Sequence, residues 1–262
     1  AAIRQLLGGV IFLSFFTFIK KTPLPTFKQL KQLFFLSIFT FVLANGFSTW
    51  SLKYIASGLG ALIGALYPLC VVLIGFFFYK KKNITKLSIA GILIGFIGLV
   101  VVLYENAIGA HSNNYFFGIL LSFIAMISWS YNTIVMSQEK IEVNPYLGLG
   151  WQMIFGSIMM LIIAYASKEV VPISSIPATT WWAIFYLITA GSILAFIAFI
   201  YSMKHLPTSI ATLYAYINPI VAIGIGSFML NEHITAKLII GSLITLAGVY
   251  LVNYANKKEK LQ

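Results

Sequence analysis

The chain contains few of the residues from which catalytic and metal sites are usually built. Its 262 residues include no aspartate, six glutamates, three histidines and one cysteine, Cys70. A single cysteine excludes a disulfide within the chain and indicates no particular compartment. The histidines, His111, His205 and His233, lie far apart in the sequence, which argues against a metal site. Because acids, nucleophiles and metal ligands gather in no motif, we expect no cofactor, and an enzyme is the disfavoured alternative.

Charge is scarce as well. Only 9% of the residues are charged, whereas 60% are hydrophobic, and the mean hydropathy is +0.95. No soluble fold buries that much apolar surface. A span needs about 20 apolar residues, and charged and turn residues divide the chain into such segments. We therefore predict an all-α integral membrane protein, embedded in the lipid bilayer, with nine visible transmembrane helices at 1–19, 32–52, 56–79, 84–104, 115–136, 147–166, 180–202, 207–230 and 234–254.

The lysines fall mostly on one side of the predicted spans. That side carries the lysines within 20–31, 80–86 and 257–260 together with Lys140 and Lys204, whereas the other side has Lys53, Lys168 and Lys237. Cytoplasmic loops carry an excess of Lys and Arg. This pattern predicts a multi-pass protein of the inner (plasma) membrane with a cytoplasmic C-terminus. It also explains the formal charge of +11 without a nucleic-acid partner.

One pattern occurs twice, at a distance of 151 residues. Ser51, Lys53, Pro68 and Gly75 match Ser202, Lys204, Pro219 and Gly226, and after a one-residue gap Thr85, Gly91 and Gly98 match Thr235, Gly241 and Gly248. The matched helices are five spans apart, so they cross the membrane in opposite directions. Inverted repeats of this kind are typical of secondary transporters.

The predicted repeats cover residues 1–104 and 115–254, followed by a tail at 255–262. The helix at 115–136 has no partner in the first half, and a five-plus-five architecture that lacks its first helix accounts for this. Several glycines within the spans are interpreted as sites of close helix packing. They are Gly8, Gly9, Gly91, Gly95, Gly98, Gly224 and Gly226.

Short motifs accompany the duplication. They are residues 50–54, 66–68, 129–131, 218–219 and 230–235, the last leading to Gly241 and Gly248. Together they resemble the ten-helix drug/metabolite transporter superfamily, EamA type. The resemblance implies a transporter that moves small organic metabolites, often amino acids or related compounds, by alternating access and frequently outward. The first repeat departs from the family, because residues 80–83 replace a Gly-Glu-like pair with lysines and asparagine, whereas the second repeat keeps Glu232.

Polar side chains within the spans are the candidates for substrate binding, because they usually face the protein interior. Tyr214 and Asn218 lie four residues apart on one helix face, and Tyr67 occupies the place of Asn218 in the first repeat. If the pseudo-symmetry holds, these three residues line one cavity. Hydrogen bonding between helices is the structural alternative.

Other candidates lie on other predicted helices. Trp129 can stack on a substrate or belong to the interfacial belt, and Asn132 and Asn45 can contact a substrate or join helices. Ser192 ranks below these residues. Arg4 is interpreted as a cation that snorkels at a helix end, with pairing to a substrate carboxylate as the alternative.

The glutamates lie at helix ends, in loops or in the tail, not inside a span. The sequence therefore argues against a carrier of cationic drugs and against proton coupling through a buried carboxylate. A transporter with a neutral site of aromatic and amide side chains for a small-molecule substrate fits best. A flippase-like carrier of a lipid-linked substrate is the alternative, and no filter-like motif supports a channel.

Overall fold

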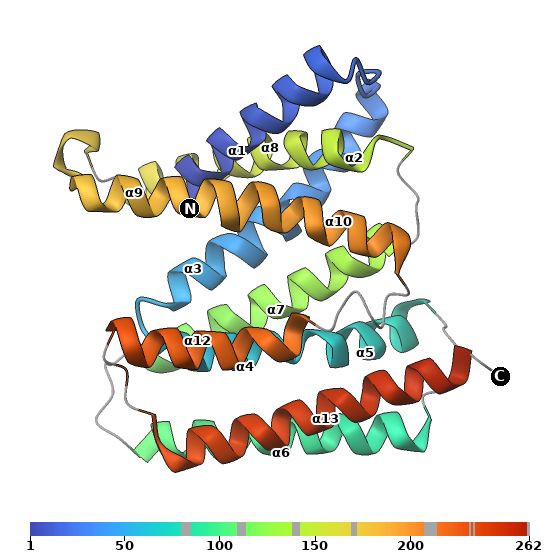
Figure 1. Ribbon diagram of the computed structural model, residues 1–262, viewed down its shortest axis with the longest axis vertical. Helices are drawn as coiled ribbons and strands as arrows, with labels where there is room; N and C mark the ends of the chain where they lie inside the picture. Colours follow the sequence, from blue (N-terminus) through green and yellow to red (C-terminus); the bar gives the residue numbers. More distant parts are fainter. Residues whose placement is uncertain are drawn as a thin grey trace. The chain divides into compact units, whose positions relative to one another are not determined.

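The computed structural model describes residues 1–79, 85–108, 114–137, 142–168, 172–206, 214–230, 232 and 234–260. Most of these residues are helical, and none of them lies in a strand (Figure 1). The α-helices are α1 (Ala2–Ser14), α2 (Phe27–Ser37), α3 (Phe47–Ser51), α4 (Ser57–Ala65), α5 (Tyr67–Tyr79), α6 (Lys86–Ile108), α7 (Tyr115–Ser137), α8 (Pro145–Ala166), α9 (Ala178–Tyr186), α10 (Ala195–His205), α12 (Tyr214–Leu230) and α13 (Ala236–Lys260). The segments η1 (Phe15–Ile19), η2 (Ile38–Gly46) and η4 (Leu187–Leu194) are π-helical, and η3 (Ile173–Ser175) is a 3-10 helix.

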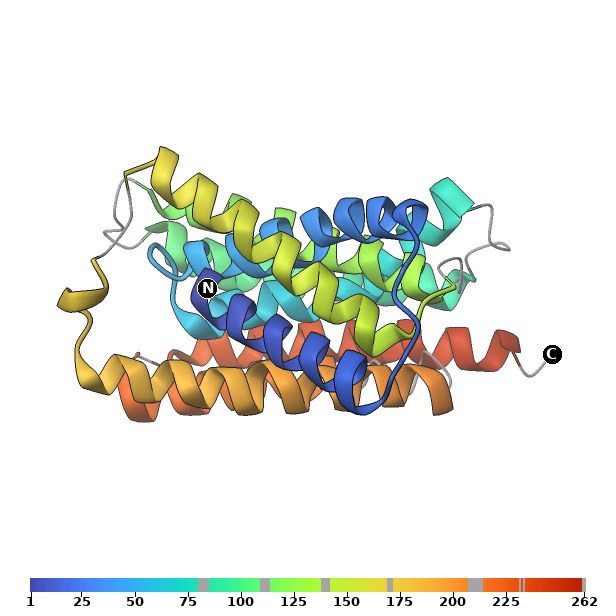
Figure 2. The ribbon, with the colours of Figure 1, turned by 90° about the horizontal axis from the view of Figure 1, so that it is seen from above.

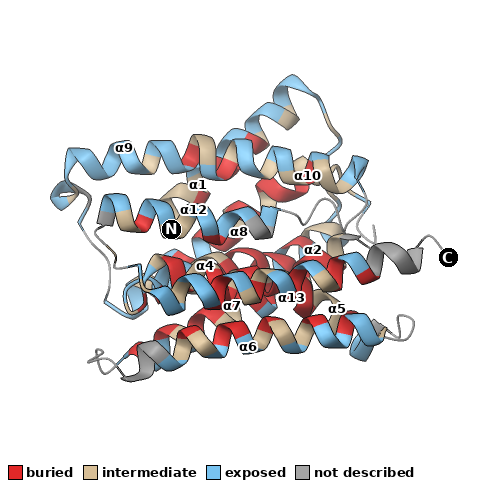
Figure 3. Cartoon of the chain, turned by 60° about the horizontal axis from the view of Figure 1, so that its bottom comes forward, coloured by how far each residue is buried: buried red, intermediate tan, exposed pale blue. Residues whose placement is uncertain are grey.

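The predicted all-α membrane fold is confirmed for the described part of the chain. Eight of its helical segments are long and apolar enough to cross a membrane, and Ile217–Met229 forms a shorter apolar helix. Large apolar side chains stay exposed on the helices, for example Phe228 at 89% and Trp182 at 73%, and α9 is mostly exposed (Figure 3). Lipid tails would cover such surfaces in a bilayer.

Some spans begin earlier than the hydropathy indicated. The second begins at Phe27 instead of residue 32, because Thr26 and Gln29 form a capping box in which the N–H of Thr26 donates to Gln29 Oε1 at 2.8 Å. The sixth begins at Pro145 instead of residue 147, because the side chain of Asn144 accepts the first free N–H groups of α8. Polar caps, and not apolar content, set these ends.

The chain divides into two compact units. Unit 1 comprises Ala1–Gly46 and Val135–Leu206, and unit 2 comprises Phe47–Ile134 and Pro207–Gln262. Each unit therefore draws segments from both predicted repeats. Helices that the repeat relates to one another, such as α6 and α13, pack together inside one unit.

Unit 1 is built around α8, on which α1, α2 and η2 pack (Figure 2). Glycine permits a close approach of α1 to α8, since a Cβ added at Gly9 would lie 3.1 Å from the carbonyl oxygen of Gly150. This confirms the packing role predicted for Gly9. The core of the unit consists of Phe12, Phe41, Leu149, Met153 and Ile200.

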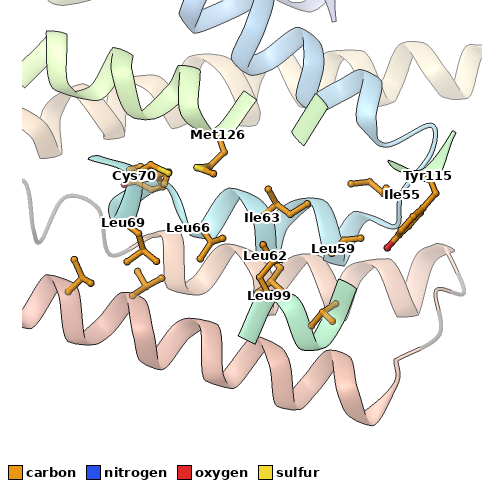
Figure 4. Packing of buried hydrophobic residues seen from close by; sticks show 14 residues of the cluster. Ile55, Leu59, Leu62, Ile63, Leu66, Leu69, Cys70, Leu99, Tyr115 and Met126 are labelled. Atoms are coloured by element: carbon orange, nitrogen blue, oxygen red, sulfur yellow. The ribbon is translucent and has the colours of Figure 1, made fainter. Parts of the chain in front are cut away.

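Unit 2 has a larger apolar core, contributed by α4, α5, α6, α7 and α13 (Figure 4). Leu62, Ile63 and Leu66 are completely buried at its centre. The α4 helix ends at Ala65, and α5 begins at Tyr67. Pro68 has no N–H to donate to the preceding turn, which explains a break at this point.

Cys70 lies in this core on α5 and is 8% exposed. Buried structural thiols are inert. We expect N-ethylmaleimide to leave Cys70 unlabelled in the folded protein and to label it completely after denaturation in SDS, as measured by intact mass. The Cys70→Ala variant, which should gain no mass in either condition, is the control. Rapid labelling of the folded protein would contradict the packing of α5.

Glycines bring α6 and α13 into direct contact. A Cβ added at Gly91 would lie 2.7 Å from the carbonyl oxygen of Gly248, and one at Gly98 would lie 2.6 Å from that of Gly241. The repeat matches Gly91 with Gly241 and Gly98 with Gly248, so its symmetry exchanges the two contacts. A reciprocal contact of this kind is the mark of a two-fold interface. It supports the inverted repeat and confirms the packing role of Gly91 and Gly98.

The remaining glycines predicted to pack are not alike. The predicted packing role is confirmed for Gly8 and Gly95. A Cβ added at Gly8 would lie 2.5 Å from the nearest side-chain atom, and one added at Gly95 would lie 2.7 Å from the side-chain atom nearest to it. Gly226 lies against the carboxylate of Glu232 and leaves room for it. The prediction for Gly224 is wrong, since a Cβ there would meet no described atom within 4 Å. Gly224 is exposed on α12, away from neighbouring helices.

Candidate functional site

Three elements of unit 2 meet at Tyr214, the first residue of α12. The ring of Tyr214 stacks on that of Tyr67, with centroids 5.8 Å apart and an interplanar angle of 25°. The indole N–H of Trp129, on α7, donates to the Tyr214 hydroxyl oxygen at 3.1 Å. We call Tyr67, Trp129 and Tyr214 the Tyr214 junction. Two of the three side chains were predicted to lie together, and the structure brings all three into contact.

The members of the junction differ in burial. Tyr67 is 3% exposed and belongs to the core of unit 2, whereas Tyr214 is 40% exposed. Trp129 is half-buried. Tyr67 therefore forms a fixed platform, and Tyr214 is held on it by the stacked ring and the indole while part of its surface stays accessible. An aromatic residue fixed in this way can contact a solute at little cost in side-chain entropy.

Ser130 anchors this platform from α7. Its hydroxyl donates to the carbonyl oxygen of Tyr67 at 3.1 Å and to that of Met126 at 2.8 Å. The Tyr67 carbonyl lies at the break between α4 and α5, where the helix ladder is interrupted. Ser130 was not predicted as a functional residue, although it is the middle residue of the motif at 129–131.

The predicted amide residues of unit 2 lie in different surroundings. Asn218 is exposed on α12, one turn after Tyr214. Asn132 is 1% exposed on α7, one turn after Trp129. Asn218 is thus available to a ligand on the same helix as Tyr214, whereas Asn132 lies in the interior.

Asn45 belongs to unit 1 and has other partners. Its Oδ1 accepts a hydrogen bond from Nη2 of Arg4 at 3.1 Å, and its amide donates to the carbonyl oxygen of Thr40 at 2.8 Å. The Thr40 hydroxyl in turn donates to Oε1 of Gln152 at 3.1 Å. The structure thus places Asn45 in a polar cluster on α1, η2 and α8. The sequence had offered no reason to pair it with Arg4.

Glu232 is a second residue whose role the sequence analysis missed. Its carboxylate accepts hydrogen bonds from the N–H of Ser57 at 2.9 Å, from the Ser57 hydroxyl at 2.9 Å and from the N–H of Gly58 at 3.4 Å. These are the first residues of α4, whose N-terminus carries a partial positive charge. The Ala56 that precedes α4 has no side chain with which to cap it. The motif at 230–235 includes Glu232, but only the fold shows what its carboxylate contacts.

The described part of unit 2 offers neutral recognition chemistry near Tyr214. Rings, a hydroxyl and an amide can stack on a solute and exchange hydrogen bonds with it, but they supply no general acid or base at neutral pH. Among the described residues no group of three or more His, Cys, Asp or Glu could hold a metal ion. The loop at 80–83, Glu139, Glu169, His111 and His233 lie outside the described residues.

Comparison with known proteins identifies relatives along the whole chain. The profile of the EamA-like transporter family matches residues 1–104 and 116–254. An uncharacterized inner membrane transporter of Escherichia coli (strain K12), YedA, is 27% identical over 236 residues, which are 90% of this chain and 74% of YedA. An uncharacterized transporter of Bacillus subtilis (strain 168), YoaV, is 21% identical over 270 residues, or 100% of this chain and 88% of YoaV.

Two further similarities agree with these. A WAT1-related chloroplast protein of Arabidopsis thaliana is 26% identical over 265 residues, which are 97% of this chain and 62% of that protein. One crystal structure superimposes with a TM-score of 0.65 at 18% identity, covering 99% of this chain and 88% of its own. At that identity the likeness shows the fold alone.

Proposed function

Because this chain belongs to the EamA-like transporter family and is a multi-pass membrane transporter, we propose that it exports small organic metabolites, amino acids or related compounds, by alternating access. The Tyr214 junction is the observation that carries the proposal. It joins α5, α7 and α12 of unit 2 at a tyrosine that stays 40% exposed. A tyrosine held in this way presents a ring that can stack on a solute and a hydroxyl that can form a hydrogen bond with it.

The proposed binding residues in unit 2 are Tyr67, Trp129, Asn132, Tyr214 and Asn218. Tyr214 would stack on a planar or apolar part of the solute, and Asn218 would donate and accept hydrogen bonds one turn away. No acid of the described residues lies at this place, so recognition here depends on shape and hydrogen bonding and not on a cationic group of the solute. The placement of the lysines supports a cytoplasmic C-terminus.

Transport in proteoliposomes that contain the full-length protein tests the proposal. Radiolabelled amino acids, sugars and nucleosides are offered to wild-type protein, to Tyr214→Phe and to Tyr214→Ala. Tyr214→Phe loses one hydrogen bond of about 1 kcal/mol, which corresponds to about a fivefold lower kcat/KM. Tyr214→Ala also loses the stacked ring, so we expect a loss of at least about tenfold.

The matched control is Tyr250→Ala, which removes a tyrosine that is 60% exposed on α13 and should leave transport unchanged. Equal transport by wild type and Tyr214→Ala would remove the junction from the binding site. If no soluble compound moves in either direction, the carrier of a lipid-linked substrate becomes the better explanation.

A further inference from the structure

Arg4 is the only arginine of the chain, and it lies inside unit 1. Its guanidinium donates from Nη2 to Oδ1 of Asn45 at 3.1 Å. Its Nη1 lies near η4, since a Cβ added at Gly191 would be 3.8 Å from it. The next residue, Ser192, lies close to α1, because a Cβ added at Gly8 would be 3.6 Å from the Cβ of Ser192. Gly8 lies one turn after Gln5 on α1. We call Arg4, Gln5, Asn45 and Ser192 the Arg4 cluster.

The positive charge of this cluster is not neutralised by the described residues. The partner of Arg4 among them is the neutral amide of Asn45, and no described carboxylate forms an ion pair with it. The Nε of Arg4 is buried and has no hydrogen-bond partner in the described part of the chain. Arg4 is half-buried, and a cation that is partly withdrawn from water is costly unless an anion accompanies it. Within a membrane span, such a group indicates function.

Two neighbours of Arg4 are also incompletely bonded. Gln5 and Ser192 are both 0% exposed. Neither the oxygen nor the nitrogen of the Gln5 amide, nor the Ser192 hydroxyl, has a hydrogen-bond partner among the described residues. Buried polar groups are bonded in the great majority of cases. The unbonded atoms of Arg4, Gln5 and Ser192 belong to α1 and to η4, which packs on it, so a polar ligand between these two segments could complete their hydrogen bonds.

The backbone around the cluster is unusual in the same place. Asn45 lies in the π-helix η2, and Gly191 and Ser192 lie in the π-helix η4. At the repeat offset of 151 residues, Thr40 of η2 corresponds in sequence to Gly191 of η4. The two π-helices therefore occupy matching positions of the two repeats. π-Helices make up well under about 1% of residues and occur frequently at functional sites. The sequence of neither segment had indicated one.

We infer that the Arg4 cluster, which lies within unit 1, binds the carboxylate group of a small organic metabolite. A single guanidinium carries one positive charge, which matches a carboxylate better than a phosphate dianion. Its free N–H groups, the Gln5 amide nitrogen and the Ser192 hydroxyl can donate to the two carboxylate oxygens, and Gln5 Oε1 can accept from an adjacent ammonium or hydroxyl group. This inference rests on the proposed function and narrows its substrates to carboxylate-bearing compounds. It replaces the snorkelling role for Arg4 that the sequence favoured.

Matched pairs of probes test the inference. The melting temperature of the full-length protein in neutral detergent is measured with L-phenylalanine, L-leucine, the corresponding amino-acid amides and inorganic phosphate, and uptake of the two labelled amino acids is measured in phosphatidylcholine vesicles. We expect the carboxylates to stabilise wild-type protein and the amides and phosphate to have no effect. Arg4→Gln should require at least about tenfold more amino acid for half-maximal stabilisation, because a charge-assisted contact is lost. The control Lys168→Gln removes an exposed lysine of unit 1 and should behave as wild type.

Gln5→Leu separates binding from folding. It replaces an unbonded buried amide with an apolar side chain, so the ligand-free protein should melt at the same or a higher temperature, yet lose the stabilisation by amino acids. Carboxylate binding that survives in Arg4→Gln or Gln5→Leu, equal effects of acids and amides, or a preference for phosphate would each overturn the inference. Transport of sugars or nucleosides that depends on Tyr214 and not on Arg4 would overturn it while leaving the proposed function intact.

Discussion

The Gly248→Leu variant is expected to yield almost no folded protein, because its side chain would force α6 and α13 apart. A Cβ at Gly248 already collides with the backbone nitrogen of Gly95 and lies 2.5 Å from the carbonyl oxygen of Gly91. Both obstacles are backbone atoms, which cannot rotate away as a side chain can. Overpacking a core by single methylenes costs about 1–3 kcal/mol, and a leucine that displaces two helices should exceed that range. Fluorescence-detected size-exclusion chromatography after heating measures the loss.

A second glycine provides the matched control for this experiment. Gly224→Leu places the same side chain on α12, where an added Cβ meets no described atom within 4 Å. Replacement of a helix glycine there should be neutral or slightly stabilising. Gly248→Ala, which adds only the Cβ, should fall between the two. If Gly248→Leu melted within about 2 °C of wild type, a difference of at most about 1 kcal/mol, the glycine contact between α6 and α13 would be wrong.

Glu232→Ala is expected to destabilise the N-terminus of α4 and lower the melting temperature. The substitution removes the acceptor of the Ser57 and Gly58 N–H groups and leaves them without their partner. Loss of a helix cap costs about 1–2 kcal/mol, which corresponds to about 2–8 °C for a chain of this size. The Ala56 before α4 offers no side chain as a substitute. Differential scanning fluorimetry of the purified protein measures the shift.

Conservative variants separate the charge of this cap from its shape. Glu232→Gln keeps one acceptor oxygen and should lose only part of the stability, whereas Ser57→Ala removes the hydroxyl that donates to the carboxylate at 2.9 Å. In a double-mutant cycle the effects of Glu232→Ala and Ser57→Ala should not add, because each removes the same bond. Additive effects would show that Glu232 stabilises the protein through other contacts.

The spans and the repeat could be predicted from the sequence because both depend on pattern alone. Apolar length marks a membrane helix, and the match of Gly91 and Gly98 with Gly241 and Gly248 depends on spacing. The ends of helices were less predictable, since a cap such as Thr26 in α2 interrupts no apolar run. The error at Gly224 has the same origin, because composition does not show which face of α12 packs.

Contacts between distant residues lay beyond the sequence. Trp129 and Tyr214 are 85 residues apart, and Ser57 and Glu232 are 175 apart. Nothing in the chain specified that these pairs meet, so Trp129 was predicted only as a stacking residue or interfacial anchor. The π-helices carry no composition of their own and were not predicted. The bond between Arg4 and Asn45 joins residues 41 apart, and no sequence pattern linked them. Tyr67 was placed with Asn218 because both precede a proline at matching repeat positions, and Tyr214 joined them because it lies on the same helix face as Asn218.

The glycine interface of α6 and α13 has a consequence for the proposed transport cycle. When two inverted repeats exchange their conformations, each contact in one state becomes its symmetry-related contact in the other. The contact of Gly91 with Gly248 is converted into that of Gly98 with Gly241, and both are already present. The contacts between α6 and α13 can therefore stay unchanged through the proposed cycle while the surrounding helices move.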